Sequence, residues 1–197
     1  RVTGHGLTAV GYRAAQTTTT GYETAIGYEA LKLNATGDSN VAVGYRAATN
    51  LTSSNTTAVG YEALTTATSG SSNTAVGRRA LRYTTTGASN VAIGAYALQA
   101  NTTGTYNVAV GRQALYLVTT GSNNVSIGDN ALRDNTASNN IAIGFEALKV
   151  NTSGTSNTAV GRRALQNNTT ANNNTAIGYN SMEANTTGAQ NTAVGLS

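Results

Sequence analysis

A triplet of Ala, then Val or Ile, then Gly returns about every 17 residues along the whole chain, with Ser126 once in place of the Ala. A nearly fixed short period means that each repeat is one structural unit that stacks on its neighbours, because a single unit cannot bury its own apolar side. The period therefore predicts a single repeat array over residues 1–197, and its glycines as structural corners. These glycines are Gly11, Gly27, Gly44, Gly60, Gly77, Gly94, Gly111, Gly128, Gly144, Gly161, Gly178 and Gly195.

The other positions of the repeat, counted from this glycine as position 0, divide into apolar and polar parts. Asn occupies position −4 in nine copies, Ala follows at position +3, and Leu occupies position +4 in eight copies. The shorter copies lose a single residue, always from the Thr- and Asn-rich stretch that follows. A loop tolerates such a deletion, whereas a one-residue slip in a strand turns every side chain to the other face. The apolar positions are therefore predicted as strands and the polar stretch as a loop.

Strands fit the apolar positions better than helices do. Two repeats together match the length of a tetratricopeptide unit, but Thr, Asn, Gly and β-branched residues are poor helix formers. The apolar positions −3 and −1 lie two apart, which is the strand period. We therefore predict an all-β fold, a parallel β-roll or β-solenoid of about twelve coils. Each coil is expected to hold a strand, a glycine corner, a short second strand and a loop. At about 4.8 Å per coil, the rod would be roughly 55–60 Å long.

The strand period also predicts which side chains face inward. We expect Val or Ile at position −1, and Thr, Val or Ile at position −3, to fill the coil, which leaves Ala and Gly outside. A face of Ala and Gly would let another chain approach closely, and a coil this small encloses little core. Both points favour an oligomer around a common axis, with a homotrimer as the expected partner arrangement. The Asn residues at position −4 are expected to form a ladder of side-chain amides.

Composition excludes several classes of function. The chain has no Cys, which excludes disulfides and thiolate chemistry, and no apolar run of about 18 residues that could insert in a membrane. The net charge of +4 is thinly spread, which does not indicate a nucleic-acid partner. Glu29, Glu62 and Glu146 share position +2, where we expect a solvated column rather than a catalytic pair. His5 stands alone. We therefore predict no enzyme activity, no catalytic residues, no metal site and no cofactor.

Several Asn-x-Ser/Thr triplets allow two interpretations. As acceptors for glycans they would lie on surface loops, whereas Asn and Thr also bond their own backbone in turns. We favour the turn interpretation. The triplets include those at Asn34, Asn101, Asn151, Asn168 and Asn185.

The segment "SNVAIG" at residues 89–94 and its eleven relatives resemble the N-S-V-A-I-G coil motif of YadA-like heads in trimeric autotransporter adhesins. The "NTAVG" and "NTTG" phrases are also similar to repeats of bacteriophage tail fibres. The resemblance covers essentially the whole chain, although Asn and Ser are exchanged and the coil is longer. It implies a left-handed parallel β-roll, three chains per head, and attachment to a host. The implied location is extracellular, on a bacterial cell surface or a virion tail fibre. Because the chain opens and closes inside a repeat, we expect it to be a segment of a longer protein.

A column of Tyr and Arg follows the corner glycine. These side chains often anchor interfaces, stack on sugar rings and pair with acidic groups. One interpretation is a stripe that binds a host-surface glycan or protein; the other is that Tyr covers the corner and stacks on the next coil. The candidate stripe comprises Tyr12, Tyr28, Tyr45, Tyr61, Arg78, Arg79, Arg112, Arg162, Arg163 and Tyr179.

The sequence thus predicts a non-enzymatic trimeric adhesin head or fibre segment that mediates attachment through a rigid repetitive rod. Two alternatives remain. An ice-binding solenoid would use Thr at position −3, but Val91, Val108 and Val125 interrupt that column, which suits a buried position. A trimeric tailspike-type protein would process glycans with acidic residues between chains.

Overall fold

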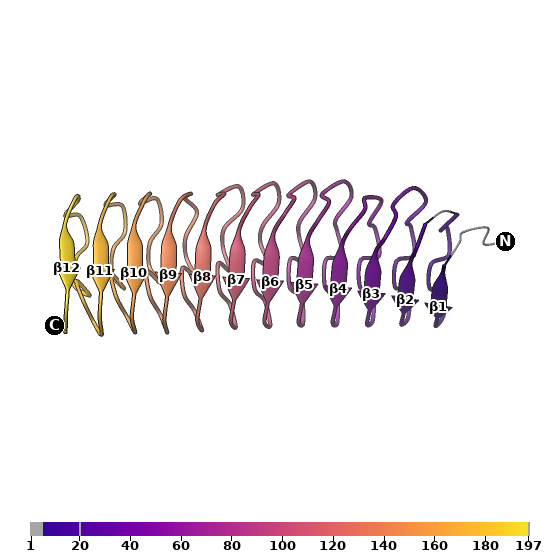
Figure 1. The fold of residues 1–197 in the computed structure, drawn as a ribbon, viewed down its shortest axis with the longest axis horizontal. Helices are drawn as coiled ribbons and strands as arrows, with labels where there is room; N and C mark the ends of the chain where they lie inside the picture. Colours follow the sequence, from indigo (N-terminus) through magenta and orange to yellow (C-terminus); the bar gives the residue numbers. More distant parts are fainter. Residues whose placement is uncertain (1–5, 20, 197) are drawn as a thin grey trace.

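The chain folds as a β-solenoid rod (Figure 1). The computed structural model describes residues 6–19 and 21–196, and in these residues twelve short strands form one parallel sheet in sequence order. They make about eleven turns of roughly 17 residues. His5 lies outside the described residues. The strands are β1 (Thr8–Val10), β2 (Thr24–Ile26), β3 (Val41–Val43), β4 (Thr57–Val59), β5 (Thr74–Val76), β6 (Val91–Ile93), β7 (Val108–Val110), β8 (Val125–Ile127), β9 (Ile141–Ile143), β10 (Thr158–Val160), β11 (Thr175–Ile177) and β12 (Thr192–Val194).

Neighbouring strands pair in a register that keeps each repeat position beside its own copy. Ala92 of β6 pairs with Ala109 of β7, where the repeat has its full length. Ala42 of β3 pairs with Ala58 of β4 in the same way, although the repeat between them is one residue shorter. The missing residue is therefore absorbed in the loop, as the sequence predicts, because a shift inside the strand would invert its faces.

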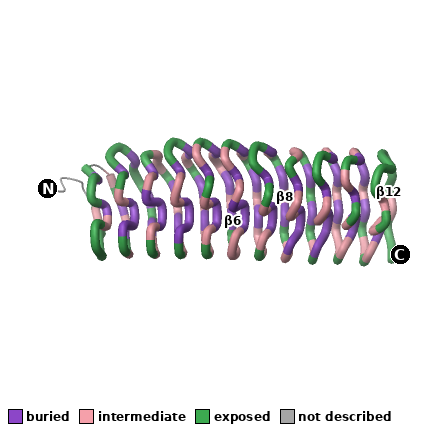
Figure 2. The backbone as a smooth tube through the Cα atoms, turned by 180° about the vertical axis from the view of Figure 1, so that it is seen from behind, coloured by how far each residue is buried: buried purple, intermediate pink, exposed green. Residues whose placement is uncertain are grey.

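The core of the rod is built from small side chains, and the predicted direction of the strand side chains is wrong. Ala92 and Leu98 are fully buried, whereas Ile93 is 41% exposed. The same alternation runs through the strands, so buried residues recur at equivalent places in successive coils (Figure 2). A coil of about 17 residues is too narrow to hold Val, Ile and Leu together. Ala from the strand leaves room for Leu at position +4, and the β-branched residues point outward.

The segment after the corner glycine is not the predicted second strand. It is a run of turns in which positions +2 and +4 adopt the left-handed region, with φ of 63° at Tyr96 and 51° at Leu98. The Tyr96 N–H donates to the Arg78 carbonyl of the preceding coil at 2.9 Å, and the Leu98 N–H donates to the Ala114 carbonyl of the following coil at 3.0 Å. The segment therefore joins both neighbouring coils. These bonds and the buried Leu offset a cost of about 1–2 kcal/mol for each left-handed non-glycine residue.

The glycine that ends each strand occupies a conformation that other residues avoid. Gly94 has φ of +134°, and a Cβ atom on it would lie 2.5 Å from the Gly111 carbonyl oxygen of the next coil. Both the dihedral angle and the close approach require glycine. The chain can therefore turn sharply after the strand while adjacent coils stay in contact.

The Asn residues at position −4 form a hydrogen-bonded ladder through the middle of the rod, which confirms the predicted column of amides. Asn107 accepts at its Oδ1 from the Asn124 N–H at 3.0 Å and from the Asn124 Nδ2 at 3.1 Å. Its own Nδ2 donates to the Gly121 carbonyl at 2.8 Å. The ladder thus joins side chain to backbone as well as amide to amide. Each buried Asn satisfies groups in the coil that follows.

A second group of buried Asn residues, at position +7, closes the loops. The Asn34 Oδ1 accepts from the Gly37 N–H at 2.9 Å, and the Asn151 Nδ2 donates to the Gly154 carbonyl at 2.8 Å. Asn34 and Asn151 are both fully buried. This confirms the turn interpretation of these Asn-x-Ser/Thr triplets.

The ladder predicts a local effect for Asn107→Ala. The Asn124 N–H and the Gly121 carbonyl would lose their partners, and each buried unpaired group costs about 1–3 kcal/mol. We expect hydrogen exchange of the backbone amides around residue 107 to speed up by about tenfold or more. The control is Thr103→Ala on an exposed loop, which should change exchange little. Equal protection in the two variants would show that the ladder does not stabilise the rod.

Candidate binding stripe

The first part of the predicted stripe is a continuous stack of aromatic rings. In-register coils bring equal positions together, so the rings of Tyr12, Tyr28, Tyr45 and Tyr61 lie one above another. Successive centroids are 5.3, 5.3 and 5.2 Å apart, with interplanar angles of 20°, 12° and 10°. The rings stay between 39% and 58% exposed. Stacking covers their faces, so this stretch stabilises the corners and offers mainly ring edges to a ligand.

Arginine continues the stack where tyrosine stops. The guanidinium of Arg78 lies 6.0 Å from the centroid of the Tyr61 ring and 5.3 Å from that of Tyr96. At the equivalent place five coils later, Arg162 lies 5.6 Å from the Phe145 ring and 5.3 Å from the Tyr179 ring. The Arg162 Nη1 also donates to the Tyr179 hydroxyl at 2.8 Å. Each guanidinium therefore takes the place of a ring between two aromatic side chains.

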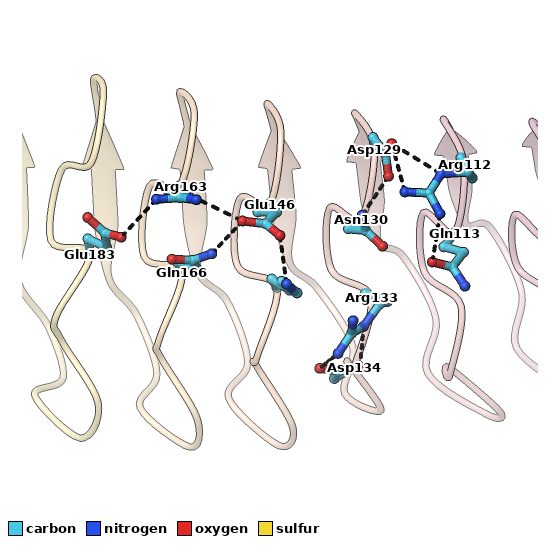
Figure 3. Close-up of polar contacts among 11 residues, drawn as sticks. Arg112, Gln113, Asp129, Asn130, Arg133, Asp134, Glu146, Arg163, Gln166 and Glu183 are labelled. Carbon is cyan, nitrogen blue, oxygen red and sulfur yellow. Dashed lines mark hydrogen bonds and ion pairs between the residues drawn. The ribbon is translucent and has the colours of Figure 1, made fainter.

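The other arginines of the stripe are held by carboxylates. Arg79 pairs with Glu62 at 2.9 Å, Arg163 pairs with Glu146 at 3.2 Å, and Arg112 pairs with Asp129 at 3.1 Å. Figure 3 shows the last two pairs, which each join adjacent coils. The structure thus divides the stripe into a stretch from Tyr12 to Arg79, a separate pair at Arg112, and a stretch from Arg162 to Tyr179.

The glutamates at position +2 are not the solvated column that the sequence predicts. Glu29 is only 5% exposed and Glu146 only 9%. Glu146 accepts from the Lys149 Nζ at 2.6 Å, from Gln166 at 2.7 Å and from Arg163 at 3.2 Å (Figure 3). The side chains at position +5 of the same coil and at position +2 of the next enclose the carboxylate. The bond from Lys149 lowers the pKa of Glu146 below its ordinary value, and the bond from Lys32 does the same at Glu29.

Two aromatic residues of the stripe are not among its predicted members. Tyr96 stands at position +2 rather than +1, and Phe145 stands in the column but between Asp129 and Arg162. Phe145 lies in the same column as Arg162, which contacts it. The signal that identifies Tyr96 is the contact between columns: positions +1 and +2 of adjacent coils lie close enough for Arg78 to contact Tyr96. A search along a single column does not find such pairs.

Glu23 is a buried carboxylate inside the Asn ladder. It occupies position −4, is 1% exposed, and accepts from the Asn34 Nδ2 at 2.9 Å, the Asn40 N–H at 3.1 Å and the Asn40 Nδ2 at 3.2 Å. Within the part of the chain that the structure describes, no basic side chain pairs with it. Burial raises the pKa of Glu23 to about 7, against the opposing effect of these bonds. Sequence reasoning missed it, although Glu in an Asn column was the signal.

The described residues contain no pocket, no group of three or more His, Cys, Asp or Glu placed to hold a metal ion, and no helix long and apolar enough to cross a membrane. The stripe is therefore an open surface along the rod.

Comparison of the chain with protein-family models, with curated proteins and with solved structures finds no match.

Glu23 predicts how the stability of the rod depends on pH. Its pKa is about 7 when folded and about 4.5 when unfolded, so the folded state favours the protonated form. Stability from this group is then highest below about pH 4.5 and falls as the pH rises to about 7. In Glu23→Gln the fall should be absent, so the stability of the variant relative to the wild type should rise between about pH 4.5 and pH 7.

Thermal unfolding at a series of pH values measures this effect. The wild type and Glu23→Gln share every other carboxylate. The difference between their unfolding midpoints therefore reports the effect of Glu23 alone. A difference that is the same at pH 4 and pH 8 would contradict the assignment.

Proposed function

We propose that this chain is the rod of a non-enzymatic trimeric attachment protein, an adhesin head or a fibre segment. The observation that supports the proposal most strongly is the outward face of the sheet. Positions −3 and −1 of every described strand point out of the coil and carry only Thr, Val or Ile. Ile93, Ile127 and Ile177 are 41%, 39% and 40% exposed. A monomeric protein rarely leaves a continuous apolar surface along its whole length.

A second and third copy of the same rod are the occupants that best fit this face. The face is straight, narrow and uniform because each strand repeats the last in register. Equivalent faces can therefore meet along their full length around a shared axis, because the same contact repeats at every coil. The resemblance to YadA-like heads supports three chains and a left-handed coil. This arrangement replaces the contact through Ala and Gly that the sequence suggested, because the Ala residues of the strands lie inside the coil.

Attachment follows from the repetition of the surface. A stiff rod of three chains presents the same corner columns many times, so weak contacts at several coils add to firm binding. The proposed location is outside the cell, on a bacterial surface or a virion fibre, and the proposed partner is a glycan or protein of a host surface.

The native mass tests the trimer. Light scattering on a sizing column should give three times the 20.0 kDa mass of the chain. Ile93→Lys places a charge on the outward face, and we expect it to shift the mass toward one chain while circular dichroism keeps its β signal. Thr103→Lys, on an exposed loop, is the matched control and should remain trimeric. A wild-type monomer would overturn the proposal.

Ice binding is a second candidate because one observation favours it. The sequence predicts that the threonines at position −3 are buried, but they point outward, and Thr158, Thr175 and Thr192 follow one another in β10 to β12. Regular outward threonines suit an ordered water layer, although Val or Ile occupies every position −1 and interrupts the threonines at position −3 in β3 and in β6 to β9. The trimer covers this face, so it predicts no thermal hysteresis. Hysteresis that is lost in Thr175→Leu would favour the ice-binding function instead.

A further inference from the structure

Arg78 and Arg162 differ from the other basic side chains of residues 6–19 and 21–196. The others each lie within 4.0 Å of a carboxylate oxygen, whereas these two form no such pair. Both are exposed, and both occupy position +1. Every other described basic side chain thus has a carboxylate partner, although Arg13, Lys32 and Arg46 share Glu29.

The guanidinium groups of both residues are held in place although they carry no counter-ion. Arg78 lies between Tyr61 and Tyr96, and Arg162 lies between Phe145 and Tyr179. The contacts with two rings restrict each guanidinium and leave N–H groups for a ligand, apart from the Arg162 Nη1, which donates to the Tyr179 hydroxyl. A planar fork of this kind matches the two oxygens of a carboxylate, or those of a sulfate, and loses little side-chain entropy on binding. Each arginine is thus a preorganised site for one anionic group.

The distance between the two sites limits the ligand. They lie five coils apart on one column, which corresponds to about 24 Å along the rod. No single small anion spans that distance, so a ligand that uses both sites is an extended chain. Its anionic groups must also be sparse. Duplex DNA carries a charge about every 1.7 Å, which calls for many phosphate contacts, whereas only two free cations are offered by the described residues.

We propose that this face of the rod binds a linear acidic polysaccharide that lies parallel to the rod axis. Its carboxylate or sulfate groups bind Arg78 and Arg162, and sugar rings between them contact the half-buried Tyr96 and the exposed Phe145. The proposal rests on the proposed attachment function and names its ligand class. The stripe follows the corner glycine, so it does not belong to the sheet face that is proposed to hold the trimer.

The test is binding of fluorescently labelled chondroitin sulfate oligosaccharides of graded length, measured by anisotropy on the full chain. Oligosaccharides longer than about 24 Å should bind, and shorter ones should bind much more weakly because they reach one arginine only. Arg78→Gln with Arg162→Gln should weaken binding of the long form by about tenfold or more. Neutral dextran should not bind.

A second double variant separates the two free arginines from general charge attraction. Arg82→Gln with Arg133→Gln, both outside the stripe, also removes two positive charges, so general attraction predicts an equally large loss. The proposal predicts less than about a threefold loss, because those arginines already have partners. Equal losses in the two double variants, or equal binding of long and short oligosaccharides, would overturn it. Single-stranded DNA that binds as tightly as the glycan would overturn the ligand class.

Light scattering of the same samples keeps the two proposals apart. A trimer that binds no acidic glycan would overturn this inference and leave the rod proposal standing. A monomer that binds the long glycan through Arg78 and Arg162 would overturn the trimer and leave this inference standing.

Discussion

Hydrogen bonds along the rod axis hold each coil to its two neighbours. Each coil encloses a core made largely of Ala and Leu, which contributes less hydrophobic stabilisation than the core of an ordinary domain. The coils therefore rely on complete pairing with their neighbours. The strands, the left-handed turns and the Asn ladder each satisfy backbone groups of the next coil, as at Asn107 and Asn124. These hydrogen bonds form only when the same repeat position of each coil stacks on its copy in the next coil. This requirement explains why the sequence repeats.

The thin core also determines the outer surface. Because Ala turns inward, the larger Val and Ile of the same strands must turn outward, as at Ala92 and Ile93. The chain thus places its smallest side chains where space is limited and its β-branched ones on a flat outer face. The apolar outer face that results is the surface proposed to pack in the trimer. The same stacking gathers the position +1 residues into a column, which brings Arg78 and Arg162 into equivalent settings.

The sequence predicts the features that follow from the spacing of the repeat. It does not predict a feature when two structures have the same spacing. The parallel solenoid, the register and the Asn ladder follow from spacing alone. The spacing does not show which strand side chains point into the core, since the alternation is the same whether Ala92 or Ile93 points inward. The small volume of the coil decides that Ala92 does. The left-handed turn at Tyr96 and Leu98 has no residue signal, because neither residue is one that favours positive φ. The burial of Glu146 depends on Arg163 of the next coil, a contact that lies beyond any single repeat.

Ala points into the coil, and substitutions at two adjacent residues of β7 test this direction. Ala109→Leu places a large side chain in the filled core, whereas Val110→Leu keeps a similar volume on the outer face. The measurement is the thermal unfolding midpoint of each variant followed by circular dichroism. We expect Ala109→Leu to lower the midpoint, at a cost of about 1–3 kcal/mol, and Val110→Leu to change it little. A Val110→Leu rod that is the less stable of the two would show that the faces are reversed.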